Sequence, residues 1–142
     1  MTPLDLTKAP PRSPREELDG LCMLPRMIDV ARAKLPGGDI GEYQIGRGMS
    51  GLVLRHLEMS VDEFVERVRT AADETDLGAQ LSKRKTAKEN RMVSLRLRRV
   101  TVADVPDDLR ESFERFYGAD LPGDKRVFDI LEQDDARTFG AK

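Results

Sequence analysis

The sequence lacks most of the residues that disulfide-stapled and metal-binding proteins depend on. Its 142 residues include no tryptophan, one cysteine and one histidine. A single cysteine, Cys22, excludes an internal disulfide, and we expect it to be a small core residue. The lone histidine, His56, cannot form a histidine-rich metal site, and no metal-ligand spacing accompanies it. The sequence predicts no metal and no other cofactor.

Long apolar runs are also missing. No stretch approaches the roughly 20 apolar residues that a membrane-spanning helix needs, and the first residues lack the basic start and apolar centre of a secretion signal. Charged residues make up 35% of the chain, and the mean hydropathy is −0.51. We therefore expect a cytoplasmic protein with no membrane partner. Its length suits one domain with its own core.

Proline and acidic residues divide the chain into three parts. Three prolines predict an extended arm over residues 1–12. We expect a helical domain over 13–118 and an acidic C-terminal segment over 119–142 that packs on or beside the same domain. The predicted fold is an all-α, compact, single-domain bundle of about five or six helices.

Periodic apolar residues and capping signals place the individual helices. Ser13-Pro14 has the form of a helix start, and a longer amphipathic helix begins near Leu21 and ends at Pro36-Gly37-Gly38. A structured loop over 37–48 follows. Further helices are expected near 49–57, 60–72, 76–82, from 86 onward, and 106–118.

Two stretches leave the choice between helix and strand open. Residues 92–98 alternate apolar and polar side chains, which is typical of a strand. The Thr86–Glu89 capping box favours a helix there instead. A short strand therefore stays an alternative near 92–102, and another near the apolar patch at 126–131.

The best candidate site lies on and after the Leu21 helix. Arg26, Asp29 and Arg32 are spaced three residues apart, so that neighbouring pairs can meet across one turn. An arginine oriented by Asp29 could bind a carboxylate or phosphate, with Glu42 and Tyr43 closing the site from the loop. The competing interpretation is a ladder of structural ion pairs.

Other motifs give weaker signals. His56 could act as a base, but a histidine beside a helical stripe is more often packed and hydrogen-bonded. The glycines of the 46–51 stretch have GxGxxG spacing, yet no βαβ unit surrounds them, which argues against dinucleotide binding.

Charge is unevenly distributed. Residues 83–99 hold eight basic residues and one acidic residue, whereas residues 104–135 hold eleven acidic and four basic residues. These segments could satisfy each other within one chain or across a homodimer. No aromatic residue lies among the basic ones to stack on bases, which argues against nucleic-acid binding.

The sequence also resembles a known family. The run LPRMIDVARAKLPGGDIGEY (24–43), the Ser13-Pro14 pair, Asn90 and the run VFDILEQDDAR (127–137) are similar to the domain of unknown function 5069 family. The resemblance covers about residues 4–137. It implies a helical fold and a cytosolic bacterial origin, and it assigns no reaction. Its recurring positions correspond to Arg12, Asp29, Arg32, Gly41, Glu42, Tyr43 and Asn90, with Asp129 and Asp135 in a C-terminal motif.

Three functional hypotheses follow. The first is binding of a small anionic ligand, or of a partner's acidic group, by the candidate site together with Arg12 and Asn90. The second is an acid/base enzyme that uses Asp29 or Glu42 as base and Tyr43 as acid or orienting group, with arginine holding the substrate. The third is a homodimeric interaction module formed by the basic and acidic segments.

Overall fold

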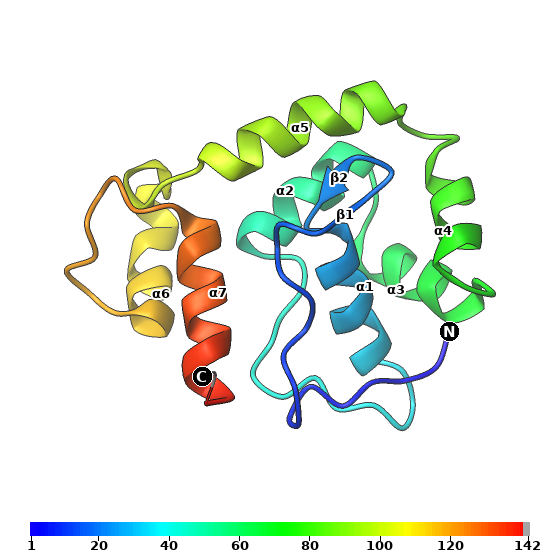
Figure 1. The fold of residues 1–142 in the computed structure, drawn as a ribbon, viewed down its shortest axis with the longest axis horizontal. Helices are drawn as coiled ribbons and strands as arrows, with labels where there is room; N and C mark the ends of the chain where they lie inside the picture. Colours follow the sequence, from blue (N-terminus) through cyan, green and yellow to red (C-terminus); the bar gives the residue numbers. More distant parts are fainter. Residues whose placement is uncertain (141–142) are drawn as a thin grey trace.

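The computed structural model describes residues 1–140. This part of the chain contains seven α-helices and one small hairpin, joined by loops (Figure 1). The hairpin consists of β1 (Glu17–Leu18) and β2 (Leu21–Cys22). The helices are α1 (Leu24–Ala33), α2 (Gly48–Leu57), α3 (Val61–Thr70), α4 (Glu74–Leu81), α5 (Ala87–Arg99), α6 (Asp107–Tyr117) and α7 (Val127–Thr138). A short 3-10 helix, Val102–Asp104, follows α5. The mainly helical prediction is confirmed, but the expected number of five or six helices is too low.

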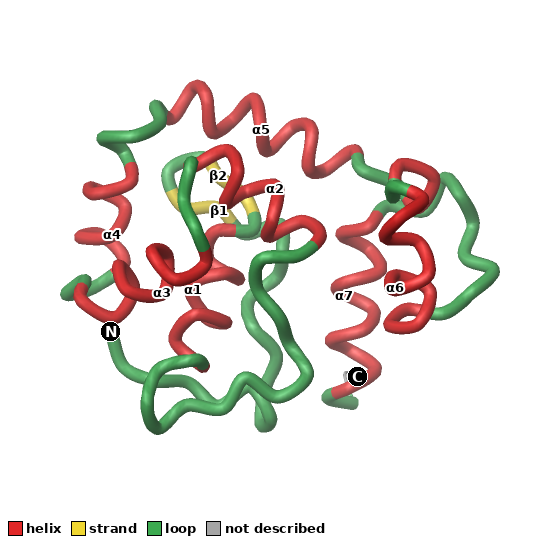
Figure 2. Tube along the Cα trace, turned by 180° about the vertical axis from the view of Figure 1, so that it is seen from behind, coloured by secondary structure: helices red, strands yellow, loops and turns green. Residues whose placement is uncertain are grey.

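The helices are arranged around α1. Figure 1 shows α5 crossing above the hairpin and α1, with α3 and α4 on one side and the α6–α7 pair on the other. Seen from behind, in Figure 2, the hairpin is the only sheet drawn in the described chain, and long loops run beneath α1. One of these loops is joined to the N-terminal arm, because Leu6 N–H donates to the Asp39 carbonyl at 2.8 Å.

The region before α1 differs from the expected helix. Ser13 and Pro14 begin a turn, in which the Glu16 N–H donates to the Ser13 carbonyl, and the chain then enters the hairpin. α1 begins only at Leu24, with Pro25 in its first turn, where the missing proline N–H is tolerated. The predicted Ser13 helix start is therefore wrong, because Ser13 caps a turn instead.

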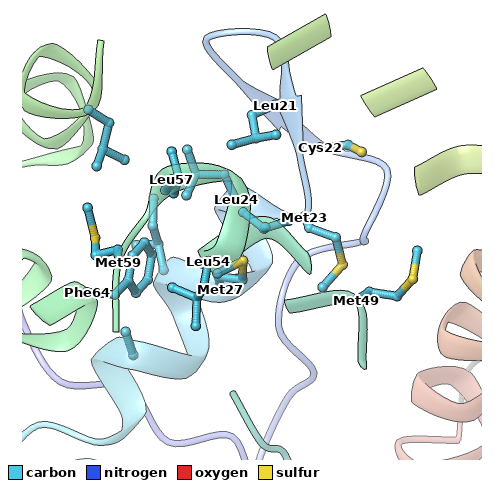
Figure 3. Packing of buried hydrophobic residues seen from close by; sticks show 14 of the residues in the cluster. Leu21, Cys22, Met23, Leu24, Met27, Met49, Leu54, Leu57, Met59 and Phe64 are labelled. Carbon is cyan, nitrogen blue, oxygen red and sulfur yellow. The ribbon is translucent and has the colours of Figure 1, made fainter. Parts of the chain in front are cut away.

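The core is filled by aliphatic side chains and methionine, as the scarcity of aromatic residues requires. α1 packs on α3, and Phe64 is fully buried between them with Met59 beside it (Figure 3). Cys22 is buried in the same cluster, which confirms the expectation of a core residue, although it lies on β2. Burial raises the pKa of its thiol.

The two strand alternatives are wrong. Residues 92–98 lie in α5, whose start carries the predicted Thr86–Glu89 capping box. Asn90, Ser94 and Leu97 form its buried face, a helical spacing that outweighs the local alternation. The apolar patch at 127–131 is the first turn of α7. An isolated bridge, Thr101 to Arg126, joins the chain just before α7 to the end of α5.

The C-terminal segment returns to the N-terminal half of the molecule. α7 buries Phe128 and Ile130, whereas no residue of α6 is buried. Residues 141–142 of the predicted acidic segment lie outside the described residues. Across residues 1–140, the structure contains no helix with the length and apolar character needed to cross a membrane.

Ser94 provides a test of how the hairpin is held against α5. Its hydroxyl donates to the Gly20 carbonyl at 2.6 Å and accepts from the Cys22 N–H at 2.9 Å. Ser94→Ala leaves two buried backbone groups without a partner, and we expect a loss of about 1–3 kcal/mol in the free energy of unfolding by urea. The exposed Ser82→Ala should change it by less than about 0.5 kcal/mol. Equal effects of the two substitutions would contradict this role.

Candidate functional site

Polar side chains from five segments of the chain meet at α1. They come from the arm, from α1 itself, from the loop before α2, and from α4 and α7. We call this set the polar cluster: Arg12, Arg26, Asp29, Tyr43, Glu74 and Asp135.

A buried ion pair lies at the centre of the polar cluster. Arg26 on α1 and Asp135 on α7 are each only 7% exposed. The two guanidinium nitrogens of Arg26 donate to the two carboxylate oxygens of Asp135, at 2.7 and 3.1 Å. Arg26 also donates to the Arg12 carbonyl at 3.2 Å. This bidentate geometry fixes α7 relative to α1 in both position and orientation.

Tyr43 contacts both members of this ion pair. Its hydroxyl donates to Asp135 at 2.8 Å, and the Arg26 guanidinium lies 5.5 Å from its ring centroid. The ring also stacks on Phe139, with centroids 6.5 Å apart. Burial, followed by the hydrogen bond to Asp135, raises the pKa of Tyr43 well above its usual range. The side chain therefore acts as a hydrogen-bond donor at neutral pH.

Arg12 connects the arm to two helices. Its side chain donates to both oxygens of Asp29 on α1, at 3.1 and 3.0 Å, and its backbone N–H donates to the same carboxylate at 2.9 Å. It also pairs with Glu74 on α4. The hydrogen bond to Glu74, together with those to Asp29, raises the pKa of the Arg12 guanidinium. Arg12 is therefore a charged anchor that holds the arm in place.

A second set of contacts joins the arm directly to α7. Ser13 donates to Glu132 at 2.8 Å, and Arg15 donates to Asp129 at 2.6 Å and also pairs with Glu132. These groups are about 40% exposed, so solvent screens the pairs and each adds little stability. Their effect is to align the arm along α7.

Three predicted site residues lie outside the polar cluster. Arg32 donates to the Thr2 carbonyl and hydroxyl, both at 2.8 Å. The predicted pairing of Asp29 with Arg32 is therefore wrong, because Asp29 is occupied by Arg12. Glu42 is exposed on the loop.

Asn90 belongs to a different contact. Its amide nitrogen donates to the Asp19 carbonyl at 3.1 Å, which orients its oxygen toward Nε2 of His56 at 2.8 Å. Because an amide oxygen only accepts, His56 donates from Nε2. Asn90 thus joins α2, α5 and the hairpin, and His56 is packed and hydrogen-bonded.

Two members of the cluster, Glu74 and Asp135, were not among the predicted site residues. Asp135 could have been found from the spacing of α7, since it lies seven residues after the buried Phe128 and shares its face. An acid on a buried helical face needs a cationic partner. Glu74 carries no such signal, because it is an ordinary acidic residue in the first turn of α4.

Two surface hollows border α7. The arm–α7 groove lies directly over Asp135, has a volume of about 360 Å³, and is lined by Pro10, Pro11, Ser13, Glu132, Asp135, Ala136 and Phe139. The second hollow, of about 250 Å³, lies between α6 and α7. No group of three or more histidine, cysteine or acidic residues within residues 1–140 is arranged to hold a metal ion.

Residues 8–137 match the family described as "Domain of unknown function (DUF5069)". The chain therefore belongs to this family, which confirms the resemblance found in the sequence. No curated protein matches the chain.

Removing one partner of the central ion pair should destabilise the protein strongly. Asp135→Ala leaves the Arg26 guanidinium buried without its carboxylate, and we expect a loss of about 3–5 kcal/mol in the free energy of unfolding. Asp129→Ala, a matched change on the same helix, removes a half-exposed pair and should cost less than about 1 kcal/mol. Urea denaturation measures both losses. A loss at Asp135 no larger than that at Asp129 would show that the pair is solvated.

The alkaline titration of the two tyrosines tests how far Tyr43 in the polar cluster and Tyr117 on α6 are shielded from water. Partial burial raises the pKa of Tyr43 and of Tyr117, the only tyrosines in the sequence. Neither should ionise at the usual pKa of about 10 in the folded protein. Above that pH the unfolded chain releases these protons first, so stability should fall as pH rises. Tyrosinate absorbance, recorded with and without urea, measures this. A native tyrosine titrating near pH 10 would contradict the expectation.

Proposed function

We propose that the protein binds a small molecule in the arm–α7 groove, and that the ligand carries a hydrogen-bond donor, such as a primary amine, next to an apolar part. The observation that supports this is the position of the groove, which opens directly over the buried Asp135. Its volume of about 360 Å³ has room for a small ligand, which would stay partly exposed because the groove is open to solvent.

The lining of the groove determines the class of ligand. Ser13, Glu132 and Asp135 present oxygen atoms, which can accept hydrogen bonds from a ligand. Pro10, Pro11 and Phe139 supply apolar and aromatic surface. A cationic amine could contact the Phe139 ring. It could also share the remaining lone pairs of Glu132 and Asp135, although these carboxylates already pair with Arg15 and Arg26.

The anionic ligand expected from the sequence receives less support. The guanidinium of Arg26 already donates to both carboxylate oxygens of Asp135, and Arg12 already pairs with Asp29 and Glu74. An external carboxylate or phosphate would have to displace one of these internal acids. The arginines therefore hold the acidic side chains beside the groove in place and do not contact the ligand.

The organisation of the cluster supports a binding role beyond stability. A buried ion pair is often no more stabilising than well-packed apolar residues, whereas fixed polar groups position the walls of a binding site. Four residues that the family resemblance places on recurring positions, Arg12, Asp29, Tyr43 and Asp135, meet in this one network. They come from separate segments, so a shared role explains why they meet.

The acid/base hypothesis has no comparable observation in its favour. Both oxygens of Asp29 accept hydrogen bonds from Arg12, and Glu42 is exposed and outside the cluster. The raised pKa of Tyr43 keeps its proton in place at neutral pH. Acid/base catalysis, a cytoplasmic location and a bacterial origin stay predictions.

Filling the groove should weaken ligand binding without disturbing the ion pair. We would titrate the protein with primary amines, neutral polyols and monocarboxylates of similar size, following amide shifts by NMR. Amines should shift residues that line the groove. Ala136→Leu places a larger side chain in the groove, and it should weaken amine binding at least tenfold, about 1.4 kcal/mol.

Thr138→Leu is the matched control, because Thr138 is exposed and does not line the groove. It should bind amines as the wild type does. Carboxylates that bind in the groove where amines do not would contradict the assigned ligand class. Equal amine affinity in Ala136→Leu and the wild type would contradict the groove as the binding site.

A further inference from the structure

The second hollow that borders α7 differs in chemistry from the arm–α7 groove. It lies between α6 and α7, which run side by side in both views (Figure 1 and Figure 2), and has a volume of about 250 Å³. We call it the α6–α7 hollow. Its lining consists of Tyr117, Leu121, Lys125, Ile130, Gln133 and Arg137. Two of these side chains are cationic and none is acidic, whereas the groove is lined by two acids and no cation.

The two helices supply four of the lining residues. Ile130, Gln133 and Arg137 are spaced three and then four residues apart on α7, so they share one face of that helix. Ile130 is only 4% exposed and forms an apolar floor. Tyr117, the last residue of α6, lines the hollow from the other helix. The arrangement places polar groups above apolar surface.

The loop from α6 to α7 completes the hollow with Leu121 and Lys125. The loop is held at Lys125, because the carbonyl of this residue accepts from the Val102 N–H at 2.9 Å. The Lys125 ammonium donates one of its three N–H groups to the amide oxygen of Gln133, at 2.6 Å. This contact leaves the amide N–H groups of Gln133, and two N–H groups of Lys125, able to donate to a ligand.

Arg137 can also bind a ligand anion. One of its guanidinium nitrogens pairs with Asp134 at 3.2 Å, and its side chain is 69% exposed. An ion pair this exposed contributes little stability, so the guanidinium can share its N–H groups with a second anion. Arg26, by contrast, is buried against both oxygens of Asp135. An anion therefore has better access to a guanidinium here than in the polar cluster.

Tyr117 adds a neutral donor to the two cations. Unlike Tyr43, it makes no side-chain hydrogen bond within residues 1–140. No buried side-chain oxygen in that range lacks a partner, so the Tyr117 hydroxyl must contact solvent. Partial burial raises its pKa, and the hydroxyl therefore keeps its proton at neutral pH. It can donate a hydrogen bond to an oxygen bound nearby.

We propose that the α6–α7 hollow binds a small organic acid, a carboxylate with a short apolar tail. The carboxylate accepts hydrogen bonds from Lys125 and Arg137, and the tail packs on Leu121 and Ile130. The volume of about 250 Å³ is below the usual range for drug-sized ligands, which limits the acid to a small one. Inorganic phosphate would satisfy the cations but leave the apolar floor unused. This site does not depend on the function proposed for the groove.

NMR titration with hexanoate, hexan-1-amine and inorganic phosphate tests the site. Hexanoate, added up to about 10 mM, which nearly saturates a site of millimolar Kd, should shift the amides of Leu121 and Lys125. Hexan-1-amine should leave these two amides unshifted, because it would meet two cations. The amides of Ser13 and Phe139 report on the arm–α7 groove. Binding at the two hollows is therefore distinguished in one spectrum.

Two substitutions on α7 should change the hexanoate affinity in opposite directions. Arg137→Gln removes a cation that binds the carboxylate, and it should weaken binding about fivefold. Asp134→Asn removes the acid that competes for Arg137, and it should strengthen binding about twofold. Tyr117→Phe keeps the ring, whose centroid lies 5.0 Å from that of Phe113, and its loss of one neutral donor should weaken binding about threefold.

Arg115→Gln and Asp62→Asn are the matched controls, because they make the same changes in charge at exposed residues that do not line the hollow. Each should bind hexanoate as the wild type does. Unshifted Leu121 and Lys125 amides would overturn the proposal, as would equal hexanoate affinity in Arg137→Gln and the wild type. Hexan-1-amine binding at the same amides would overturn the ligand charge, and phosphate binding as tight as hexanoate would overturn the apolar tail.

Discussion

The buried ion pair between Arg26 and Asp135 is the constraint on which the rest of the site depends. It joins α1 to α7, two helices 109 positions apart at their contact. Once these two side chains are paired, the position of α7 relative to α1 is fixed. Tyr43 and the arm then have a defined surface on which to pack, and the arm–α7 groove takes its shape from them.

Hydrogen bonds make this buried charge tolerable. Asp135 accepts from Arg26 and Tyr43, and Arg26 also donates to an arm carbonyl. Within the described residues, no buried side-chain nitrogen or oxygen lacks a partner. A partly satisfied network would be less stable than an apolar core. The ion pairs of Arg15 are more exposed and add little stability, because water already solvates their charges. They align the arm along α7 instead.

Local sequence signals predicted the helices well. Contacts between residues far apart in the sequence could not be predicted from such signals. The Thr86–Glu89 capping box and the apolar periodicity of the helix expected near 60–72 act within a few turns, so the sequence alone revealed them. The same local reasoning paired Asp29 with Arg32, a neighbour on the helix. The arm supplied Arg12 instead, a competitor that no helical spacing can show. The hairpin was missed for a similar reason, because its two-residue strands are too short to display a period.

The order of synthesis gives the link between α1 and α7 another consequence. A ribosome makes Arg26 long before Asp135, and domains tend to fold as they emerge. Through most of translation, Arg26 on α1 therefore has no carboxylate partner, and the arm has no α7 to pack against. The polar cluster closes only when the last helix arrives. The Arg26–Asp135 pair can thus form only after synthesis has passed residue 135.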